Sequence, residues 1–257
     1  MSSKPLYTNS YSEPAPEDLS NCYGPDPYDL NFIWPIDFSL LESERVKLVP
    51  FIPRLHAQIY VDHAASSPDM SRWLPFDLSK LEDVLSFVES FIRRSPSCIA
   101  FAVMDKGSDG KDVEGKMAGV IALIKSDKNL VTELGWVVTF PEYQRTYVTG
   151  NAIGILLRFC LELPSKTKGA LGLRRVQWTA NPLNLKSIAA AKRMGMKEEG
   201  THRWVFVLAE GKEGHATREG DPKQSRLGRG STMLAMCCDD WENGGREFVQ
   251  KMIDLRR

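Results

Sequence analysis

Glu133-Leu-Gly-Trp-Val-Val-Thr-Phe-Pro-Glu-Tyr-Gln-Arg-Thr-Tyr-Val-Thr-Gly-Asn-Ala152 is the stretch of sequence that decides the fold. It predicts a strand over residues 130–138, because valine and tryptophan favour extended backbone. A turn follows at Pro141, and a polar loop then leads into a helix with apolar periodicity over residues 152–163. The first N–H groups of a helix are unpaired and carry partial positive charge, so this arrangement predicts a site for an anion such as a phosphate. An equally good interpretation is a simple connection between a sheet and the helix that covers it.

The composition is that of a globular chain without an overall charge. Its 257 residues are 42% hydrophobic, which suffices for the core of one domain with an extension. Lys and Arg together number 33, and so do Asp and Glu, so neither nucleic acid nor a membrane is expected as a partner. No apolar run approaches the roughly 20 residues that span a bilayer, and the first residues lack the apolar core of a signal peptide. We expect a cytoplasmic protein, as a monomer or a homodimer.

The five cysteines are odd in number and scattered, and no histidine stands at metal-ligand spacing from them. This pattern predicts neither a disulfide framework nor a zinc site, and no metal is expected. Cys98, Cys160 and Cys237 lie in apolar runs, so we interpret them as small buried hydrophobes rather than catalytic thiols.

Three parts of the chain differ in composition. Residues 1–38 contain six prolines among polar residues and predict an extended arm, whose end at 31–35 is apolar enough to dock on the folded body. Residues 39–250 hold the periodic segments of a single domain, with a charged, glycine-rich loop insertion at 211–230 that is either a mobile lid or dispensable. Residues 251–257 are expected to form a C-terminal tail.

Periodic patterns within the domain predict both strands and helices. Ser79-Lys-Leu-Glu82 matches a capping box at the start of an amphipathic helix that Pro96 closes. Turn-forming residues separate three β-rich runs, which is typical of an antiparallel meander. The predicted strands are 46–52, 98–105, 117–125, 130–138, 173–180, 201–210 and 231–241, and the other predicted helices are 53–64, 152–163 and 184–194. This order indicates an α+β fold in which helices flank a mixed, mostly antiparallel sheet.

The sequence resembles the GCN5-related N-acetyltransferase (GNAT) family over roughly residues 40–250. The resemblance is to the ribosomal-protein alanine acetyltransferase-like branch, and this chain looks like a divergent, fungal-like member of it. It rests on short motifs in a fixed order: Leu41-Glu-Ser-Glu-Arg-Val-Lys-Leu48, Arg72-Trp-Leu-Pro75, Glu133-Leu-Gly-Trp136, Pro141-Glu-Tyr-Gln144, Arg175-Val176, Asn184-x-x-Ser187, Lys192-Arg-Met-Gly-Met196, Glu199-Gly200 and Asp240-Trp241.

The resemblance implies a GNAT fold and an N-acyltransferase activity. The expected acyl donor is acetyl-CoA, and the expected acceptor is a primary amine, either a protein N-terminus or a small molecule. Members generally transfer the acyl group directly in a ternary complex, without an acyl-enzyme. The alternative is a GNAT-fold protein that binds acyl-CoA or a partner without turnover.

The family's phosphate loop usually reads Gln/Arg-x-x-Gly-x-Gly/Ala, and the matching positions here run from Gln144 to Thr149. Tyr147 and Thr149 replace the two small residues, so Tyr147 either takes a φ angle that tyrosine tolerates or changes acyl-CoA binding. Backbone donors at a helix start are kept. The resemblance therefore implies acyl-CoA contacts at Gln144, Arg145, Thr146, Tyr147, Val148, Thr149 and Gly150.

The resemblance also implies the residues around the thioester. Glu133 matches the general base of many members, on a strand that splays from its neighbour, whereas the plainer interpretation is that it faces solvent or pairs with a lysine. Trp136, Val137 and Val138 match the segment whose backbone binds the pantetheine arm of acyl-CoA and polarises the thioester carbonyl.

The leaving thiolate needs a proton donor. Asn184 matches a residue that binds pantetheine, and Ser187, on the same face of the helix start, matches a hydroxyl that protonates the thiolate. Both residue types also favour helix caps, so a purely structural role is the alternative. Tyr147 and Tyr143 are further candidate acids, and Tyr147 could instead pack over the loop.

The other aromatic residues and the histidines have plainer interpretations. Trp34, Trp73 and Trp204 favour core packing over an acceptor cleft. His202 and the remaining histidines are expected to be structural or at the surface.

Overall fold

The computed structural model describes residues 7–12 and 21–255 of the chain. This described part contains a seven-stranded sheet in the order β1-β2-β3-β4-β5-β7-β6. The strands are β1 (Val46–Pro50), β2 (Ile99–Asp105), β3 (Lys116–Asp127), β4 (Val131–Thr139), β5 (Arg175–Ala180), β6 (Lys197–Val207) and β7 (Gly228–Cys237). Neighbouring strands are antiparallel, except that β4 and β5 are parallel. The predicted α+β fold with a mixed, mostly antiparallel sheet is confirmed.

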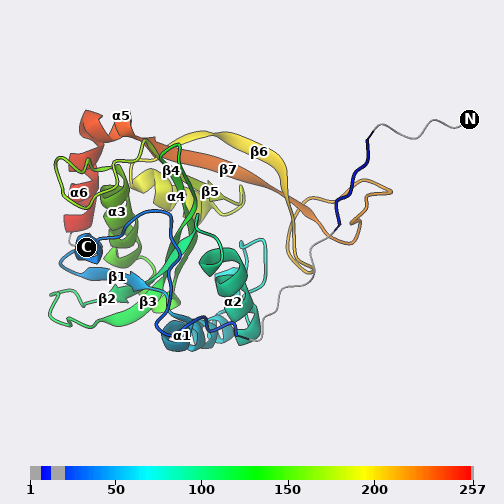
Figure 1. The fold of residues 1–257 in the computed structure, drawn as a ribbon, viewed down its shortest axis with the longest axis horizontal. Coiled ribbons are helices and arrows are strands. Elements are labelled where there is room, and N and C mark those ends of the chain that lie inside the picture. The colour runs from blue at the N-terminus through cyan, green and yellow to red at the C-terminus, as the bar shows by residue number, and fades with distance from the viewer. Residues whose placement is uncertain (1–6, 13–20, 256–257) are drawn as a thin grey trace, which may run out of the picture.

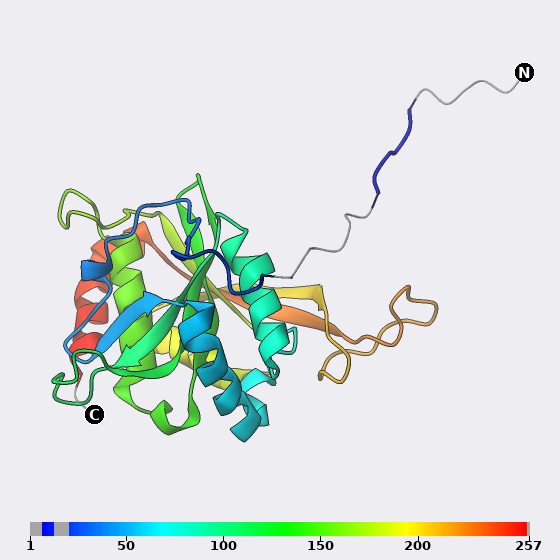
Figure 2. The same ribbon diagram turned by 60° about the horizontal axis from the view of Figure 1, so that its bottom comes forward.

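Helices cover both faces of the sheet, as Figures 1 and 2 show. The α-helices are α1 (Pro53–Ser66), α2 (Leu81–Phe87), α3 (Tyr147–Leu161), α4 (Leu185–Arg193), α5 (Cys238–Asp240) and α6 (Arg246–Asp254). Shorter turns are η1 (Phe38–Leu40), η2 (Pro68–Ser71), η3 (Val88–Arg93), η4 (Pro141–Tyr143) and η5 (Trp241–Gly245). Residues of α3, α4 and α6 join one hydrophobic core, and residues of α1 and α2 join another. The sheet therefore separates two cores.

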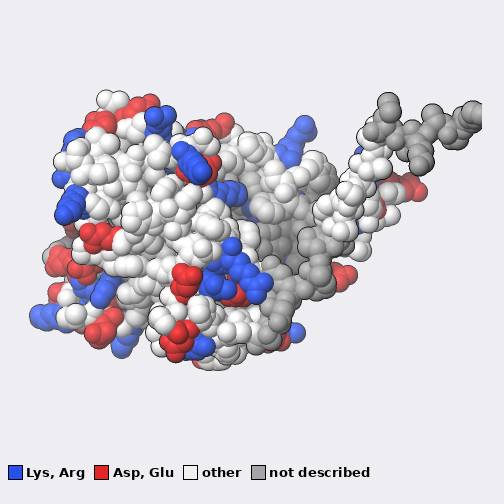
Figure 3. All heavy atoms as spheres, in the orientation of Figure 1, with Lys and Arg blue, Asp and Glu red and all other residues white. Residues whose placement is uncertain are grey.

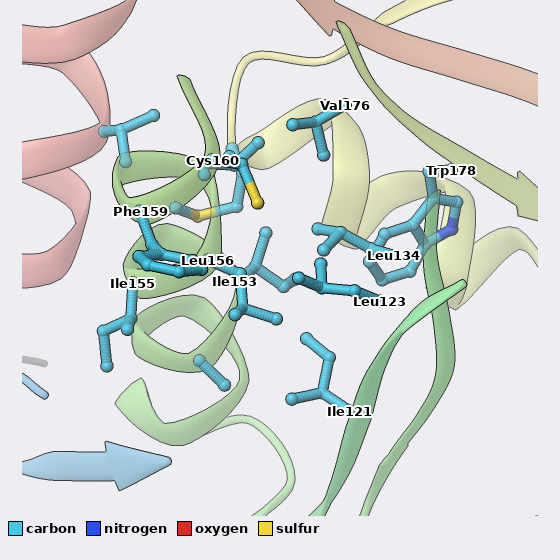
Figure 4. Close-up of a cluster of buried hydrophobic side chains, with 14 of the residues drawn as sticks. Ile121, Leu123, Leu134, Ile153, Ile155, Leu156, Phe159, Cys160, Val176 and Trp178 are labelled. Atoms are coloured by element: carbon cyan, nitrogen blue, oxygen red, sulfur yellow. The ribbon is translucent and has the colours of Figure 1, made fainter. Parts of the chain in front are cut away.

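Helix α3 is the centre of the first core. Eleven of its 15 residues are buried, because the sheet lies on one side of it and α6 on the other. Figure 4 shows Ile153 and Leu156 of α3 beside Leu123, Leu134 and Trp178 of the strands. Each fully buried side chain of this size contributes about 1.5–3 kcal/mol relative to exposure. This packing fixes the axis of α3 against β4.

The second core is rich in aromatic rings. The Trp136 ring of β4 lies 5.2 Å from that of Phe51, 5.5 Å from that of Tyr60 and 5.1 Å from that of Phe87. These spacings are typical of tilted and edge-to-face aromatic pairs. The rings join α1 and α2 to the middle of β4.

Two helix starts differ from the predictions. Helix α3 begins at Tyr147 rather than 152, because the Thr146 hydroxyl caps it by accepting the Val148 N–H at 3.3 Å. The polar residues that looked like a loop form its first turn. The predicted capping box is wrong, since α2 begins after Lys80 without a side-chain cap and the Ser79 N–H donates to Asp77 instead.

The C-terminal end also differs from the predictions. The strand predicted over 231–241 ends at Cys237, where the short α5 begins. The predicted tail is in part helical, because residues 251–254 belong to α6. Val249 and Ile253 of α6 are 0% and 3% exposed, so this helix is part of the domain core.

The N-terminal arm docks on the body through its apolar end, as predicted. Residues 1–6 and 13–20 of the predicted arm lie outside the described residues. The Asn31 side chain donates to the Arg93 carbonyl at 2.9 Å, and the Ile33 N–H donates to the Pro96 carbonyl at 2.8 Å. Phe32 and Trp34 pack against the first core.

Charged side chains of both signs are interspersed over the face shown in Figure 3. This distribution agrees with the equal numbers of basic and acidic residues in the sequence. Within residues 7–12 and 21–255, no helix has the length and apolar character needed to cross a membrane.

Candidate functional site

Strands β4 and β5 part from one another at the centre of the sheet. Their parallel ladder pairs Val131–Leu134 with Arg175–Trp178 and ends there, although β4 continues to Thr139. Two residues of β4, Trp136 and Val137, face one residue of β3 in a β-bulge, and Trp136 has a φ of 43°. Bulges commonly end a ladder and re-aim the strand. The peptide groups of residues 135–139 on the β5 side are therefore free of ladder hydrogen bonds.

The predicted phosphate loop connects the end of β4 to α3. Its backbone strain falls on Arg145, with a φ of 64°, whereas Tyr147 lies in the first turn of the helix with no such φ. The Gln144 amide donates to the Thr139 carbonyl at 3.1 Å, and the Thr149 and Thr139 hydroxyls are 2.7 Å apart. The loop is thus held to β4, with the first N–H groups of α3 at the end of the splayed strand. Such a helix start favours an anion.

The Tyr147 side chain points away from the parted strands. Its hydroxyl donates to the Asp105 carboxylate at 2.7 Å, and Asp105 ends β2, which lies on the side of β4 opposite to β5. The Arg45 guanidinium lies 4.2 Å from the centre of its ring. Burial, helped by the hydrogen bond to Asp105, raises the pKa of Tyr147. Its geometry is that of an anchor for the start of α3.

Glu133 lies at the base of the gap between β4 and β5 and is only 2% exposed. Its carboxylate accepts hydrogen bonds from Thr179 Oγ1 at 2.6 Å, Lys125 Nζ at 2.7 Å and Gln177 Nε2 at 3.2 Å. Of the two plainer interpretations, exposure of Glu133 to solvent is wrong, whereas its pairing with a lysine is observed. Thr179 lies just beyond the last paired residue of β5, so the carboxylate lies where the strands part.

Asn184 and Ser187 are held together at the start of α4. The Asn184 side chain caps the helix by accepting the Ser187 N–H at 3.2 Å. The Ser187 hydroxyl accepts the Trp178 indole N–H at 3.0 Å and donates to no residue that the structure describes. Because Trp178 ends the parallel ladder, the free hydroxyl proton lies next to the gap.

A family model described as an acetyltransferase (GNAT) domain matches residues 45–197, which is more than half of the chain. The chain belongs to the GNAT acetyltransferase family. A search of curated protein sequences gives no match to it. The family assignment is confirmed, and it covers β1 through α4 with the splayed strands and the loop before α3.

Solved structures share the fold of this GNAT chain at low sequence identity. A probable acetyltransferase of the GNAT family from Chromobacterium violaceum is 20% identical, with a TM-score of 0.62 over 93% of this chain and 100% of that chain. Spermidine N-acetyltransferase from Vibrio cholerae, in complex with CoA and spermine, is 14% identical, with a TM-score of 0.56 over 78% and 100%. RimJ from Mycobacterium smegmatis, in complex with CoA-disulfide, is 16% identical, with a TM-score of 0.57 over 80% and 88%.

The GNAT domain carries a loop of residues 208–227, between β6 and β7, that lies outside the matched region (Figure 1). Lys212 Nζ donates to the Ser71 carbonyl at 2.7 Å, and Arg72 pairs with Glu213 at 2.8 Å. Arg229, buried at the start of β7, donates to the Trp73 carbonyl at 3.0 Å. Burial lowers the pKa of Arg229, and the charge of Glu133 opposes that shift. These contacts tie the loop and the start of β7 to residues 71–73.

Three buried polar atoms lie unpaired on the same side of the GNAT sheet as α1. The Tyr60 hydroxyl lies close enough to the Trp136 indole and the Ser71 hydroxyl for both to oppose the rise in its pKa, but none of the three makes a hydrogen bond of good geometry with another described residue. Burial raises the pKa of Tyr60. Unpaired buried polar groups are costly, and they commonly mark a place where water or a ligand binds.

Sequence reasoning missed several residues of this GNAT site. The three donors to Glu133 and the buried Arg229 come from β3, β5 and β7, and no local motif indicates them. The predicted core packing is confirmed for Trp34 and is wrong for Trp204, whose side chain is 57% exposed. His202 is exposed, as expected, and Cys98 and Cys160 are buried, whereas the prediction that Cys237 is buried is wrong, since it is half-buried at the end of β7.

Proposed function

We propose that the protein is an N-acetyltransferase that moves an acetyl group from acetyl-CoA to a primary amine. The observation that carries this proposal is the parting of β4 and β5 beside the start of α3. The peptide groups of residues 135–138 on the β5 side have no ladder partner and suit an extended, amide-containing arm, because such an arm can add hydrogen bonds where the ladder stops. The start of α3 suits the phosphates at the other end of the same ligand. The CoA complexes of two structural relatives agree with this choice of ligand.

In this proposal, Trp136, Val137 and Val138 bind the pantetheine arm through their backbone. Their N–H groups polarise the thioester carbonyl and stabilise the negative oxygen that forms when the amine attacks. Gln144 to Gly150 bind the phosphates with backbone N–H groups, and the Arg145 charge adds to them. Asn184 offers its side-chain amide N–H to the pantetheine while its oxygen caps α4.

Glu133 is the proposed general base. Glu133 takes one proton from the ammonium form of the acceptor, directly or through one water, and the neutral amine then forms a bond to the thioester carbon. Thr179, Lys125 and Gln177 fix the carboxylate for this role. The carbon–sulfur bond breaks next, and the amide and CoA leave without an acyl-enzyme.

Ser187 is the proposed acid for the departing sulfur. Its oxygen already accepts the Trp178 N–H, so its own proton can move to the thiolate, and the proton that the nitrogen of the adduct loses then restores the hydroxyl through water. Tyr147 is the weaker candidate, because its proton is donated to Asp105 on the far side of β4. Its proposed role is to hold the start of α3.

The acceptor is proposed to bind between α1, the loop of residues 208–227 and the base of the gap. The unpaired atoms of Tyr60, Ser71 and Trp136 lie on this side and suit the polar groups of an amine. A protein N-terminus and a small-molecule amine both fit this chemistry. The finer placement in the ribosomal-protein alanine acetyltransferase-like branch, as a fungal-like member in the cytosol, stays a prediction.

A specific observation favours a second candidate, a GNAT-fold protein that binds acyl-CoA or a partner without turnover. Thr146 already accepts the Val148 N–H, so one donor of the first turn is occupied, and both small residues of the family's loop are replaced. Calorimetry with acetyl-CoA and with CoA tests the binding of the cofactor, which the enzyme and the acyl-CoA-binding alternative have in common. Absence of binding at millimolar ligand would rule out the enzyme. Binding without thiol release from acetyl-CoA, across a panel of amines and N-terminal peptides, would favour the second candidate.

A further inference from the structure

The last turn of α6 is joined to the first turns of α3 by two buried polar side chains. Asn151 of α3, 1% exposed, donates to the Ile253 carbonyl at 3.1 Å and to the Tyr147 carbonyl at 3.2 Å, while its oxygen accepts from the Ser43 hydroxyl at 2.7 Å. Arg45, 4% exposed, donates to the same Ile253 carbonyl at 2.8 Å. Carbonyl groups at a helix end lack partners within the helix. Here Asn151 of α3 and Arg45, which precedes β1, satisfy the Ile253 carbonyl.

One turn further along α3, Gly154 packs directly against Ile253 of α6. A Cβ atom at Gly154 would lie 2.6 Å from Cγ1 of Ile253, which is closer than real Cβ contacts come. The two helices therefore approach as closely as they do only because residue 154 is glycine. Ile253 is 3% exposed, so α6 has no room to move aside without opening the first core.

Asn151 bonds the Tyr147 carbonyl, and Arg45 lies over the Tyr147 ring, so both act on the residue that begins α3. The phosphate loop ends at this residue. Helix α6 lies outside the region matched by the family model, which ends at residue 197. Two side chains inside the family match thus join the start of α3 to a helix outside it.

We infer that Asn151 and the end of α6 position the phosphate loop for acyl-CoA. Asn151 is a positioning residue in this inference, since it acts through the start of α3 and not on the ligand. The inference rests on the proposed function for its ligand, but the positioning itself is a property of the free protein.

The test compares Asn151→Ala and Gly154→Ala with the control Glu162→Gln. The control weakens the other anchor of α6, where Glu162 accepts from Arg246 at 2.6 Å, far along α3 from the loop. For each protein, calorimetry with CoA gives the Kd, steady-state kinetics gives KM for acetyl-CoA and for the acceptor, and hydrogen exchange gives the protection of residues 145–150.

Asn151→Ala removes the hydrogen bonds that hold the start of α3, and Gly154→Ala pushes the end of α6 away from α3, so each should raise the Kd for CoA and the KM for acetyl-CoA about tenfold. The acceptor KM should stay within about twofold, and exchange at 145–150 should be faster in the free protein. The control should lose thermal stability without these changes. Equal CoA affinity and equal exchange in Asn151→Ala and Glu162→Gln would overturn the inference. If the wild type binds no CoA while exchange still rises in Asn151→Ala, the proposed function fails and the positioning stands.

Discussion

Replacement of Glu133 by glutamine separates the chemical role of this residue from its structural role. The carboxylate accepts from Lys125 and Gln177 on one oxygen and from Thr179 on the other. A glutamine can keep its oxygen toward Lys125 and Gln177 and donate its N–H to the Thr179 hydroxyl, because a hydroxyl can turn to accept. All buried polar atoms then stay paired.

The structural cost of Glu133→Gln is therefore small. It reduces mainly to the lost charge pairing with Lys125, whose side chain is 55% exposed and screened by water, so we expect about 0.5–1 kcal/mol. The catalytic cost of losing a positioned general base is larger, about 10²–10⁴-fold in rate. At pH 9 the loss should be smaller than at pH 6, because an N-terminal amine has a pKa of about 8 and is already neutral there.

The assay is thiol release from acetyl-CoA between pH 6 and 9.5, with calorimetry of CoA binding and thermal unfolding on the same samples. Thr179→Val is the matched control, since it removes one hydrogen bond and keeps the carboxylate, so its rate should fall far less. Equal turnover by Glu133→Gln and wild type across the pH range would refute the reasoning. An equal fractional loss at every pH would also refute it, because a base that matters only while the amine is charged cannot act that way.

Four further variants have expected outcomes that urea unfolding, kinetics and calorimetry can check. Tyr147→Phe removes the hydrogen bond to Asp105, so the free energy of unfolding in urea should fall by about 1–2 kcal/mol. The kcat should stay within about twofold of the wild type. A hundredfold loss of kcat would instead identify Tyr147 as the acid. Ser187→Ala should lower kcat about tenfold or more at unchanged Kd for CoA, whereas Asn184→Ala should cost about 1 kcal/mol of stability through the lost cap and raise that Kd about fivefold. A stability loss at constant Kd would leave Asn184 as a cap alone. Burial lowers the pKa of His56 to about 4, so the folded state stays neutral while the unfolded chain takes up a proton below about 6.5. Stability should then fall by on the order of 3 kcal/mol as the pH drops from about 6.5 to about 4, and His56→Gln should flatten this profile in urea unfolding.

The sequence predicts the elements whose signals are local. Strand β4 and the end of α4 at Gly195, with a φ of 87°, follow from β-branched residues and from a glycine that tolerates left-handed backbone. The start of α3 could not be predicted from apolar periodicity, because its first turn is polar and Thr146 supplies the cap. Helix α6 was missed although Val249, Met252 and Ile253 have helical spacing, since its apolar face is short and lies at the end of the chain.

The candidate site is predictable only where one segment builds it. Glu133 and the phosphate loop belong to one stretch, so their order along the chain sets their order in space. The donors to Glu133 and the partner of Tyr147 are different, since Asp105 is 42 residues away and Thr179 is 46 residues from Glu133. Such pairs depend on strand order and register, which the alternation of side chains does not encode.

The short ladder between β4 and β5 has a consequence for how the chain folds. It joins two groups of strands, β1 to β4 and β5 to β7, through only four residue pairs. Strands β2, β3 and β4 follow one another along the chain with short connections, whereas β1 pairs with β2, and β5 with β7, across more than 50 residues. Contacts between distant residues form slowly, so β2 to β4 can assemble while β5 and β7 are still unpaired. The boundary between the groups is the gap where the ligand is proposed to bind, and it would be among the last parts of the molecule to take shape.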